Sequence, residues 1–408
     1  MALKRDSLLF TLFLGAVCAL PPLSIDMGLP GIPAIEATFA DAAGRGPLTL
    51  SLFLVGFAIS PIICGPLADR FGRRWTLLVG LGVFSIAATG CALAPSFHAL
   101  LAVRMVQGLA AGCCAIVPFA VVRDLFEGAT ARHRLSQVTA VLGIAPMVAP
   151  VFGAWVMAIG DWRSIYALQA LSGLILLGLT AIGLTESLPV ERRRSVSPTH
   201  LVRSYGMVLS DRPFRGFCLV YALGFACMFS YISGSPGVVM GTLGLGGSAF
   251  SLLFGATSCG VLVGSLISGR LSKRAVSSRK VLSFGLALMF ASALGALGLV
   301  AMGVVYTYTL MPLMGLVIFC FGLIAPSTNH EAMHNLPQVA GAASGIMRCV
   351  QMVTGAVASA SVALLEPLHH PALVMTFLMA LFVVLASGTY LWQLRGERAL
   401  RVAPANVT

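Results

Sequence analysis

Charged residues are scarce in this chain. Its 408 residues include 26 Lys and Arg together with 14 Asp and Glu, so only 10% are charged, whereas a soluble globular domain has about 25%. So few charges cannot cover the surface of a water-soluble protein of this length, and 58% of the residues are hydrophobic. The composition excludes a cytosolic enzyme, a nucleic-acid-binding protein and a disordered chain. It predicts a protein that crosses a membrane several times.

Motifs for cofactors are missing as well. The chain has no Gly-x-x-x-x-Gly-Lys-Ser/Thr loop for ATP and no His/Cys/Asp group with metal-site spacing, so we predict neither a cofactor nor a metal. An intramembrane enzyme would need a nucleophile and a base at one depth. Ser24 beside Asp26 comes nearest, but no buried histidine joins them, and we do not expect an enzyme. All ten cysteines lie inside hydrophobic stretches, and we expect free thiols.

Twelve hydrophobic runs are long enough to cross the hydrocarbon core, which takes about 20 residues. They cover residues 8–35, 48–68, 76–94, 99–121, 135–159, 164–184, 216–240, 249–269, 280–301, 308–329, 339–364 and 372–393. We therefore expect an all-α membrane protein with twelve transmembrane helices in two six-helix halves. The predicted parts are an N-terminal bundle over 1–184, a cytoplasmic central loop over 185–215, and a C-terminal bundle over 216–408 with a short cytoplasmic tail.

The basic residues predict the orientation. With the N-terminus inside, 22 of the 26 Lys and Arg fall in cytoplasmic segments and only Arg45 and Arg163 fall outside. This positive-inside pattern predicts that both termini are cytoplasmic, and it explains the net charge of +12 without nucleic acid. Lys4 and Arg5 precede the first run as in a signal peptide. No cleavage site is convincing, however, and we expect this span to be retained.

A repeat with an offset of 200 residues relates the two halves. Residues 65–74 (GPLADRFGRR) follow the second span, and residues 265–274 (SLISGRLSKR) follow the eighth, with basic residues in the same register. Short cytoplasmic loops commonly collect arginines, but this does not account for the matched register. Two halves related in this way predict alternating access to a central site.

Three ionisable residues fall clearly inside the spans, where a buried charge is costly and usually functional. They are Asp26, Arg104 and Arg348. At about 1.5 Å per residue, Asp26 lies roughly 27 Å from the cytoplasmic face and Arg104 near 22 Å, so the two are expected to be neighbours. Our hypothesis is that Asp26 binds and releases a coupled proton, with Arg104 or a cationic drug opposing protonation. The alternative is a static Asp26–Arg104 pair that locks the first half.

Several segments resemble the major facilitator superfamily. Residues 65–74 are similar to its signature between spans two and three, residues 101–108 (LAVRMVQG) to its span-four proton-coupling motif, and residues 143–153 (GIAPMVAPVFG) to the antiporter motif of drug exporters. Residues 24–33 (SIDMGLPGIP) and 231–236 (YISGSP) resemble the Bcr/CflA drug-resistance subfamily. The resemblance runs the length of the chain. It implies a proton-coupled exporter of hydrophobic antibiotics such as bicyclomycin, chloramphenicol or florfenicol.

The resemblance also implies a setting and roles for residues. We expect a monomer in the bacterial inner membrane, with a small hydrophobic drug, protons and the lipid bilayer as partners and no nucleic acid. Asp26 and Arg104 are the expected proton-coupling residues. The expected cytoplasmic gate consists of Gly65, Asp69, Gly72, Arg73 and Asp124, and the antiporter motif of Gly143, Pro146, Pro150 and Gly153.

Each of these motifs has a physical interpretation. Gly65 and Gly72 would allow close helix approach and a tight turn, and Arg73 would pair with Asp124. The two prolines would kink span five. Solvated loop charges and purely structural prolines are the alternatives. Small-residue pairs predict packing seams at Gly108/Gly112, Gly260/Gly264 and Gly341/Gly345.

A substrate cavity is expected between the halves, lined by Gln107, Phe225, Met228, Phe229, Tyr231 and Arg348. The span-seven residues would form an apolar, adaptable surface, although such residues also face lipid or neighbouring helices. Arg348 departs from the resemblance, because an apolar residue is expected at its depth. It would salt-bridge Asp26, bind an anionic substrate or donate to backbone carbonyls, and the sequence leaves all three open.

Two other functions were weighed against drug export. Export of a small metabolite, an amino acid or a sugar, would give nearly the same sequence signature. A channel would need rings of polar residues along a pore, and twelve spans in two repeats argue against it.

Overall fold

The computed structural model describes residues 7–189, 191, 193 and 198–402. These residues form helices joined by loops, without a strand, and twelve of the helical segments are long and apolar enough to cross a membrane. The predicted fold class and number of spans are therefore confirmed. Lys4, Arg5, Arg192 and Arg194, which belong to the predicted cytoplasmic set of basic residues, lie outside the described residues.

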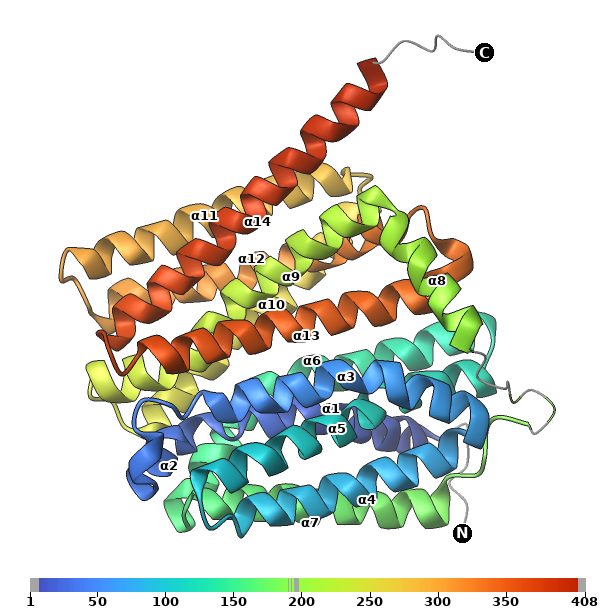
Figure 1. Cartoon of the computed structure of the whole chain (residues 1–408), viewed down its shortest axis with the longest axis horizontal. Coiled ribbons are helices and arrows are strands. Elements are labelled where there is room, and N and C mark those ends of the chain that lie inside the picture. Colours follow the sequence, from blue (N-terminus) through green and yellow to red (C-terminus); the bar gives the residue numbers. More distant parts are fainter. Residues whose placement is uncertain (1–6, 190, 192, 194–197, 403–408) are drawn as a thin grey trace. The chain divides into compact units, whose positions relative to one another are not determined.

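The helices follow the predicted runs to within several residues. The first six spans comprise α1 (Leu8–Asp26) with α2 (Ile32–Thr38), then α3 (Leu48–Phe71), α4 (Arg73–Ala92), α5 (Phe97–Leu125), α6 (Gly128–Ile159) and α7 (Trp162–Gly183) (Figure 1). After α8 (Pro198–Ser210) in the central loop come α9 (Arg212–Pro236) with a π-helical turn (Gly237–Thr242), α10 (Gly247–Lys273), α11 (Ser278–Ala301), α12 (Thr307–Met333), α13 (Ala340–Leu365) and α14 (Pro371–Val402).

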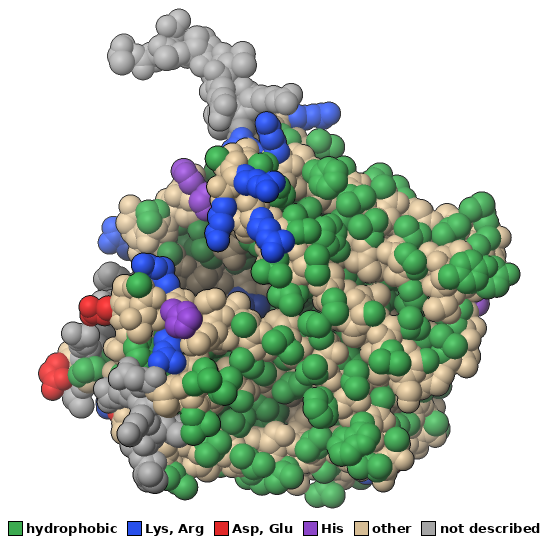
Figure 2. All heavy atoms as spheres, turned by 180° about the vertical axis from the view of Figure 1, so that it is seen from behind, with side chains coloured by type: hydrophobic (Ala, Val, Ile, Leu, Met, Phe, Trp, Pro, Cys, Tyr) green, Lys and Arg blue, Asp and Glu red, His purple; other side chains and the backbone are tan. Residues whose placement is uncertain are grey.

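Apolar side chains cover the outside of the helices. Hydrophobic residues predominate on the face drawn in Figure 2, and large ones such as Trp75, Val79, Ile86 and Trp155 are exposed. Lipid tails accept such a surface without the penalty that water would impose. The helices also satisfy their own backbone hydrogen bonds, as the hydrocarbon core requires.

The first span is interrupted beside Asp26. α1 ends at Asp26, and a 3₁₀ turn (Leu29–Gly31) leads into α2. Pro30 and Pro33 have no backbone N–H, so they cannot donate the bonds that would carry α1 onward. The two prolines thereby place Asp26 at the C-terminal end of a helix inside the span.

Internal packing divides the chain into two units. Unit 1 comprises Met1–Pro198, Ser233–Ala256 and Ala356–Pro371, and unit 2 comprises Thr199–Ile232, Thr257–Gly355 and Ala372–Thr408. In unit 1, α3 and α4 pack along α5, and α6 packs along α1. In unit 2, α11 packs along α12. Unit 1 contains the whole predicted N-terminal bundle and parts of later helices, and the division into two six-helix halves stays a prediction.

Glycines bring pairs of helices into close contact. A Cβ atom at Gly108 of α5 would collide with the backbone of Phe53 in α3, so a larger residue would push these helices apart. Such contacts confirm the predicted seams at Gly108/Gly112 and Gly260/Gly264. The seam predicted at Gly341/Gly345 is absent, because a Cβ there would meet no atom of the described residues.

The two repeated loops turn at different places. Gly72 alone separates α3 from α4, and its φ of +99° is a conformation that side chains with a Cβ rarely adopt. The matching position in the second half is Ser272, which continues the helix. There α10 runs on to Lys273, and the positive φ falls at Ala275. The sequence repeat is therefore not a repeat of the turn.

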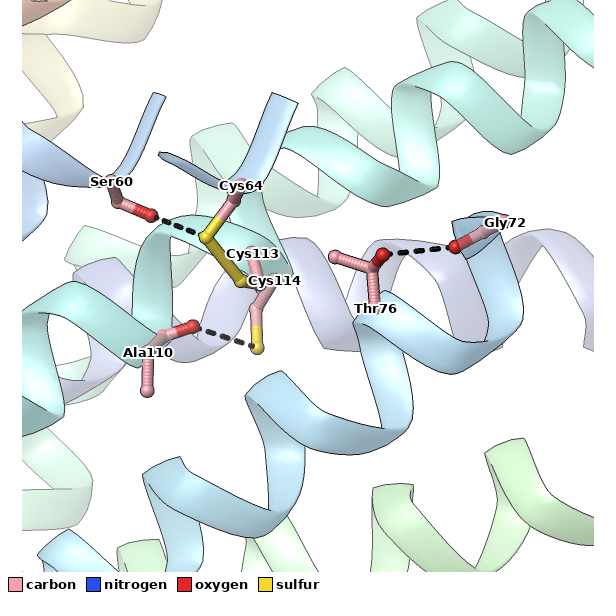
Figure 3. The surroundings of a disulfide bond; sticks show 7 residues. All are labelled: Ser60, Cys64, Gly72, Thr76, Ala110, Cys113 and Cys114. Atoms are coloured by element: carbon pink, nitrogen blue, oxygen red, sulfur yellow. Dashed lines mark hydrogen bonds between the residues drawn. A yellow bond between two sulfur atoms is a disulfide. The ribbon is translucent and has the colours of Figure 1, made fainter. Parts of the chain in front are cut away.

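One cysteine pair departs from the prediction. Cys64 of α3 and Cys113 of α5 form a disulfide, with their Cα atoms 5.6 Å apart (Figure 3). The other eight cysteines form no disulfide among the described residues, so the prediction of ten free thiols is wrong for this pair. That prediction assumed that paired cysteines lie in extracytoplasmic loops, whereas the packing of α3 on α5 brings these two together within the bundle.

Candidate functional site

Asp26 is buried, with 5% of its surface exposed, at the C-terminal end of α1. No hydrogen bond or ion pair joins its carboxylate to any residue that the structure describes. An ionisable residue buried inside a membrane span is rare and usually functional. This environment is suited to a group that binds a proton.

Arg104 lies beside the same segment and is almost completely buried, with 1% exposed. Its guanidinium donates to the backbone carbonyls of Thr49 (3.2 Å) and Ser24 (3.3 Å), and it lies over the ring of Phe53 at 4.5 Å. Arg104 therefore ties α5 to α3 and to α1. Its contact in α1 lies two residues before Asp26. The static Asp26–Arg104 salt bridge that we considered does not form among the described residues.

A buried chain of amides continues from Arg104. The guanidinium donates to Oε1 of Gln107 (2.8 Å), and Nε2 of Gln107 donates to Oε1 of Gln169 in α7 (2.8 Å). Nε2 of Gln169 is buried and has no hydrogen-bond partner among the described residues. Gln107 was expected in the substrate cavity, and Gln169 was not predicted. Gln169 is the only amide residue in its hydrophobic run, and this is the feature that could have identified it.

Ion pairs join three helices of unit 1 at the end predicted to be cytoplasmic. Arg73 at the start of α4 binds Asp124 at the end of α5, with Nε and Oδ2 2.9 Å apart, and it also binds Asp69 of α3. Ser187 donates to the same Asp124 oxygen at 3.2 Å. The structure thus contains the predicted Arg73–Asp124 pair. Its members lie in one unit, so it ties α3, α4 and α5 together and holds Asp69 at the surface.

Glu186 caps α4 and was not predicted. Its carboxylate accepts hydrogen bonds from the backbone N–H groups of Arg73 (2.9 Å) and Arg74 (3.2 Å), where a helix N-terminus favours negative charge. It occupies the space that a Cβ at Gly72 would take. The tight turn expected at Gly72 is therefore present. The close helix approach expected at Gly65 is absent, because a Cβ there would meet no described atom.

The antiporter-motif residues lie in α6, which remains helical through Pro146 and Pro150. Gly153 packs against the backbone of Met27, the residue after Asp26. Gly143 is half-buried in the same helix. Residues 143–153 therefore pack against the segment that carries Asp26, through the absence of a side chain at Gly153 and through Ala149, which lies in one buried cluster with Met27.

Serine hydroxyls join helices of unit 1 near the end predicted to be extracytoplasmic. Ser51 of α3 donates to the carbonyl of Ala356 in α13 (2.8 Å), and Ser359 of α13 donates to that of Pro47 (2.7 Å). These bonds hold the start of α3 against the end of α13. These bonds could not be predicted from the sequence, since isolated serines occur throughout the spans.

The predicted cavity residues of unit 2 are engaged with one another. Phe225, Met228, Phe229 and Tyr231 of α9 are buried. Phe225 lies 5.4 Å from Phe229 between ring centroids, and the Tyr231 hydroxyl is 2.7 Å from that of Thr257. These contacts are those of residues facing neighbouring helices, and their role in a substrate cavity stays a prediction.

Arg348 lies on an exposed position of α13 and donates to Oε1 of Gln351, one helical turn further on, at 3.4 Å. Gln351 is itself buried and was not predicted. The observed bond goes to a side chain of the same helix. It therefore differs from the backbone-carbonyl contact that we considered, and leaves anionic-substrate binding as a prediction.

Twelve apolar spans with polar side chains buried between them define a polytopic membrane transporter. The family model described as "Major Facilitator Superfamily" matches residues 12–359. The chain belongs to this superfamily. It is accordingly a transporter and not an enzyme.

Relatives with assigned names are transporters too. The chain is 31% identical over 392 residues to the "Uncharacterized MFS-type transporter YdgK" of Bacillus subtilis (strain 168), covering 94% of this chain and 95% of the relative. It is 30% identical over 243 residues to the "Multidrug resistance protein MdtL" of Escherichia coli O139:H28 (strain E24377A / ETEC). That match spans only 60% of this chain and 61% of MdtL.

Solved structures share the fold. A bacterial homolog of the human lysosomal transporter Spinster, in an inward-facing and unoccupied conformation, matches with a TM-score of 0.76 at 13% identity, over 96% of this chain and 98% of that one. A D-xylose-proton symporter matches with a TM-score of 0.70 at 16% identity, over 93% and 97%. At these identities the likeness shows the fold alone.

Proposed function

We propose that this protein is a proton-coupled multidrug efflux antiporter of the bacterial inner membrane, of the Bcr/CflA type, which exports hydrophobic antibiotics by alternating access. The observation that carries the proposal is the buried carboxyl group of Asp26, which has no hydrogen bond or ion pair with the described residues and lies two residues after the carbonyl that Arg104 binds. The partial match to a protein named for multidrug resistance supports the substrate class.

In this mechanism Asp26 takes up a proton when its site opens to the outside and releases it to the cytoplasm. Protonation removes a negative charge two residues after the Ser24 carbonyl that Arg104 binds, and deprotonation restores it. Because Arg104 also holds the Ser24 and Thr49 carbonyls, a change in its attraction to Asp26 would shift α1 and α3 relative to α5. A cationic or polar drug would compete with the proton for the same carboxylate.

The energy of one proton is sufficient for drug export. A proton entering down about 100 mV and one pH unit supplies about 2.3 kcal/mol from the potential and about 1.4 kcal/mol from the pH difference. At about 1.4 kcal/mol for each tenfold ratio, this supports a drug gradient of a few hundredfold.

Replacing Asp26 with Asn tests the proposal. Asn keeps the size of the side chain but cannot bind and release a proton, so Asp26→Asn should abolish the proton-driven accumulation of a fluorescent hydrophobic cation inside energised everted vesicles, which corresponds to efflux from the cell. Asp41→Asn is the matched control. Asp41 is an exposed carboxylate 3.1 Å from His98, and its replacement should leave efflux unchanged. Wild-type efflux should also collapse on adding a protonophore.

Full efflux by Asp26→Asn at normal expression would rule out the carrier role. Failure of wild-type vesicles to move any of a panel of hydrophobic drugs, together with proton-driven movement of an amino acid or sugar, would replace drug export by the metabolite alternative.

A further inference from the structure

A lateral groove of about 660 Å³ lies between α3 and α4 in unit 1, on the lipid-facing side. We name it the α3–α4 groove, and its walls are Ile63, Leu67 and Phe71 of α3 and Trp75, Val79 and Val83 of α4. Its floor consists of small residues, among them Ala110 and the disulfide-bonded Cys64 and Cys113. Figure 3 shows this disulfide where α3 meets α5.

The groove follows from the local sequence. Gly72 turns the chain tightly between α3 and α4, and both helices then pack on α5 while making few contacts with each other. Gly80 lets α4 approach Cys113 of α5 closely, and Ala110 has only a methyl group to fill the space between α3 and α4. The α3–α4 groove is therefore open and bordered by large hydrophobic side chains, of which Trp75 is 59% and Val79 61% exposed.

The depth of the groove matches one leaflet of a bilayer. From Trp75 to Val83 it follows eight residues of α4, which is roughly 12 Å along the helix axis. Half of a hydrocarbon core is about 15 Å thick. Trp75 lies at the end of α4 that the charge pattern predicts to be cytoplasmic, where tryptophan favours the membrane interface.

Positive charge is confined to this end of the groove. Arg193, from the segment after α7, contributes to the lining. Its Nε is buried and has no hydrogen-bond partner among the described residues, nor does any described carboxylate form an ion pair with it. Arg70 lies close by, with its guanidinium 5.2 Å above the ring of Phe71. Two acids of neighbouring segments bind other groups, because Glu186 caps α4 and Asp69 binds Arg73.

We propose that the α3–α4 groove binds one anionic phospholipid of the inner leaflet, with an acyl chain along the apolar trough and the phosphate on Arg193. A basic group at the interface above an apolar slot between helices is suited to such a headgroup. A neutral drug would leave the positive charge of Arg193 uncompensated, which is why a lipid phosphate fits the groove better.

Lipid competition tests this site. Purified protein is incubated with equal amounts of phosphatidylglycerol and phosphatidylcholine that carry identical acyl chains, and native mass spectrometry measures the ratio of the two in the first bound lipid. Wild type should prefer phosphatidylglycerol. Arg193→Gln should lower the ratio about fivefold, which corresponds to about 1 kcal/mol for one arginine near the membrane surface. Arg193→Lys should keep most of the preference.

Two further variants make the test specific. Arg123→Gln removes an exposed arginine of α5, whose Nε donates only to the carbonyl of Phe119 in its own helix at 3.3 Å, and it should leave the ratio unchanged. Val79→Trp should fill the trough and lower the occupancy of the first lipid for both headgroups.

Several results would overturn the proposal. Equal binding of the two lipids by wild type, an equal effect of Arg193→Gln and Arg123→Gln, or full occupancy in Val79→Trp would each show that no anionic lipid is held here. A dimer that dissociates in Val79→Trp would show that the groove is instead covered by a second copy of the chain.

Discussion

Adding a single methyl group at Gly153 should lower both the stability and the transport activity of this protein. A Cβ atom at Gly153 would lie 3.0 Å from the carbonyl carbon of Met27 and 3.1 Å from its Cα, and closer still to the carbonyl oxygen. Carbon atoms pack favourably at about 3.5–4.0 Å. Because all three neighbours are backbone atoms, no side-chain rotation relieves the overlap. Gly153→Ala must therefore push α6 away from the segment that follows Asp26.

The expected cost is that of overpacking a closely packed interior, about 1–3 kcal/mol. The free energy of unfolding of purified Gly153→Ala, measured by denaturation in mixed micelles, should fall by this amount. Drug efflux should fall as well, because the displaced segment carries the proposed proton-binding residue.

Gly65→Ala is the matched control for this prediction. It makes the same chemical change in the same unit, but its Cβ would meet no described atom, so stability should stay at the wild-type value or rise slightly through the better helix propensity of alanine. If Gly153→Ala were as stable and as active as Gly65→Ala, the tight α1–α6 packing and the reasoning built on it would be refuted.

Two more predictions concern charged groups. A double-mutant cycle of Arg73→Gln and Asp124→Asn should show a coupling of about 0.5–3 kcal/mol in the free energy of unfolding, because the two side chains are largely buried and lie 2.9 Å apart. A coupling of zero would contradict a stabilising Arg73–Asp124 ion pair. Burial, and then the nearby Glu36 carboxylate, raise the pKa of Glu366 from 4.5 to about 7. The native state holds this proton where the unfolded chain has lost it, so the contribution of Glu366 to stability declines as pH rises from about 4.5 to about 7. Glu366→Gln should weaken the dependence of the melting temperature on pH over that range. An unchanged pH dependence would contradict this assignment.

Much of the architecture could be predicted from the sequence because hydrocarbon imposes a strict requirement on it. A span needs about 20 apolar residues, so the spans were visible as uninterrupted runs. Asp26 and Arg104 stood out for the same reason, since an ionisable residue in such a run is rare. Their depth along the helix axis was also predictable from the rise per residue, which is why the two were expected to be neighbours.

Partners across helices could not be predicted in the same way. Gln169 and Glu186 were missed because a single polar residue in or beside a span is common, and only packing shows which ones meet Gln107 or the start of α4. The Cys64–Cys113 disulfide depends likewise on the contact of α3 with α5. The close helix approach expected at Gly65 is not found among the described residues, since a small residue allows close approach without requiring it.

The sequence by itself determined the number of membrane helices, the superfamily resemblance and the ionisable residues placed within the spans, because these depend on composition and on distance along one chain. The tertiary structure decided that Asp26 has no hydrogen-bond or ion-pair partner among the described residues, that Arg104 binds backbone carbonyls, and that α3 and α4 leave a groove between them. These outcomes depend on rotations and distances between helices, which are set by many side chains acting together and are not written in any single segment.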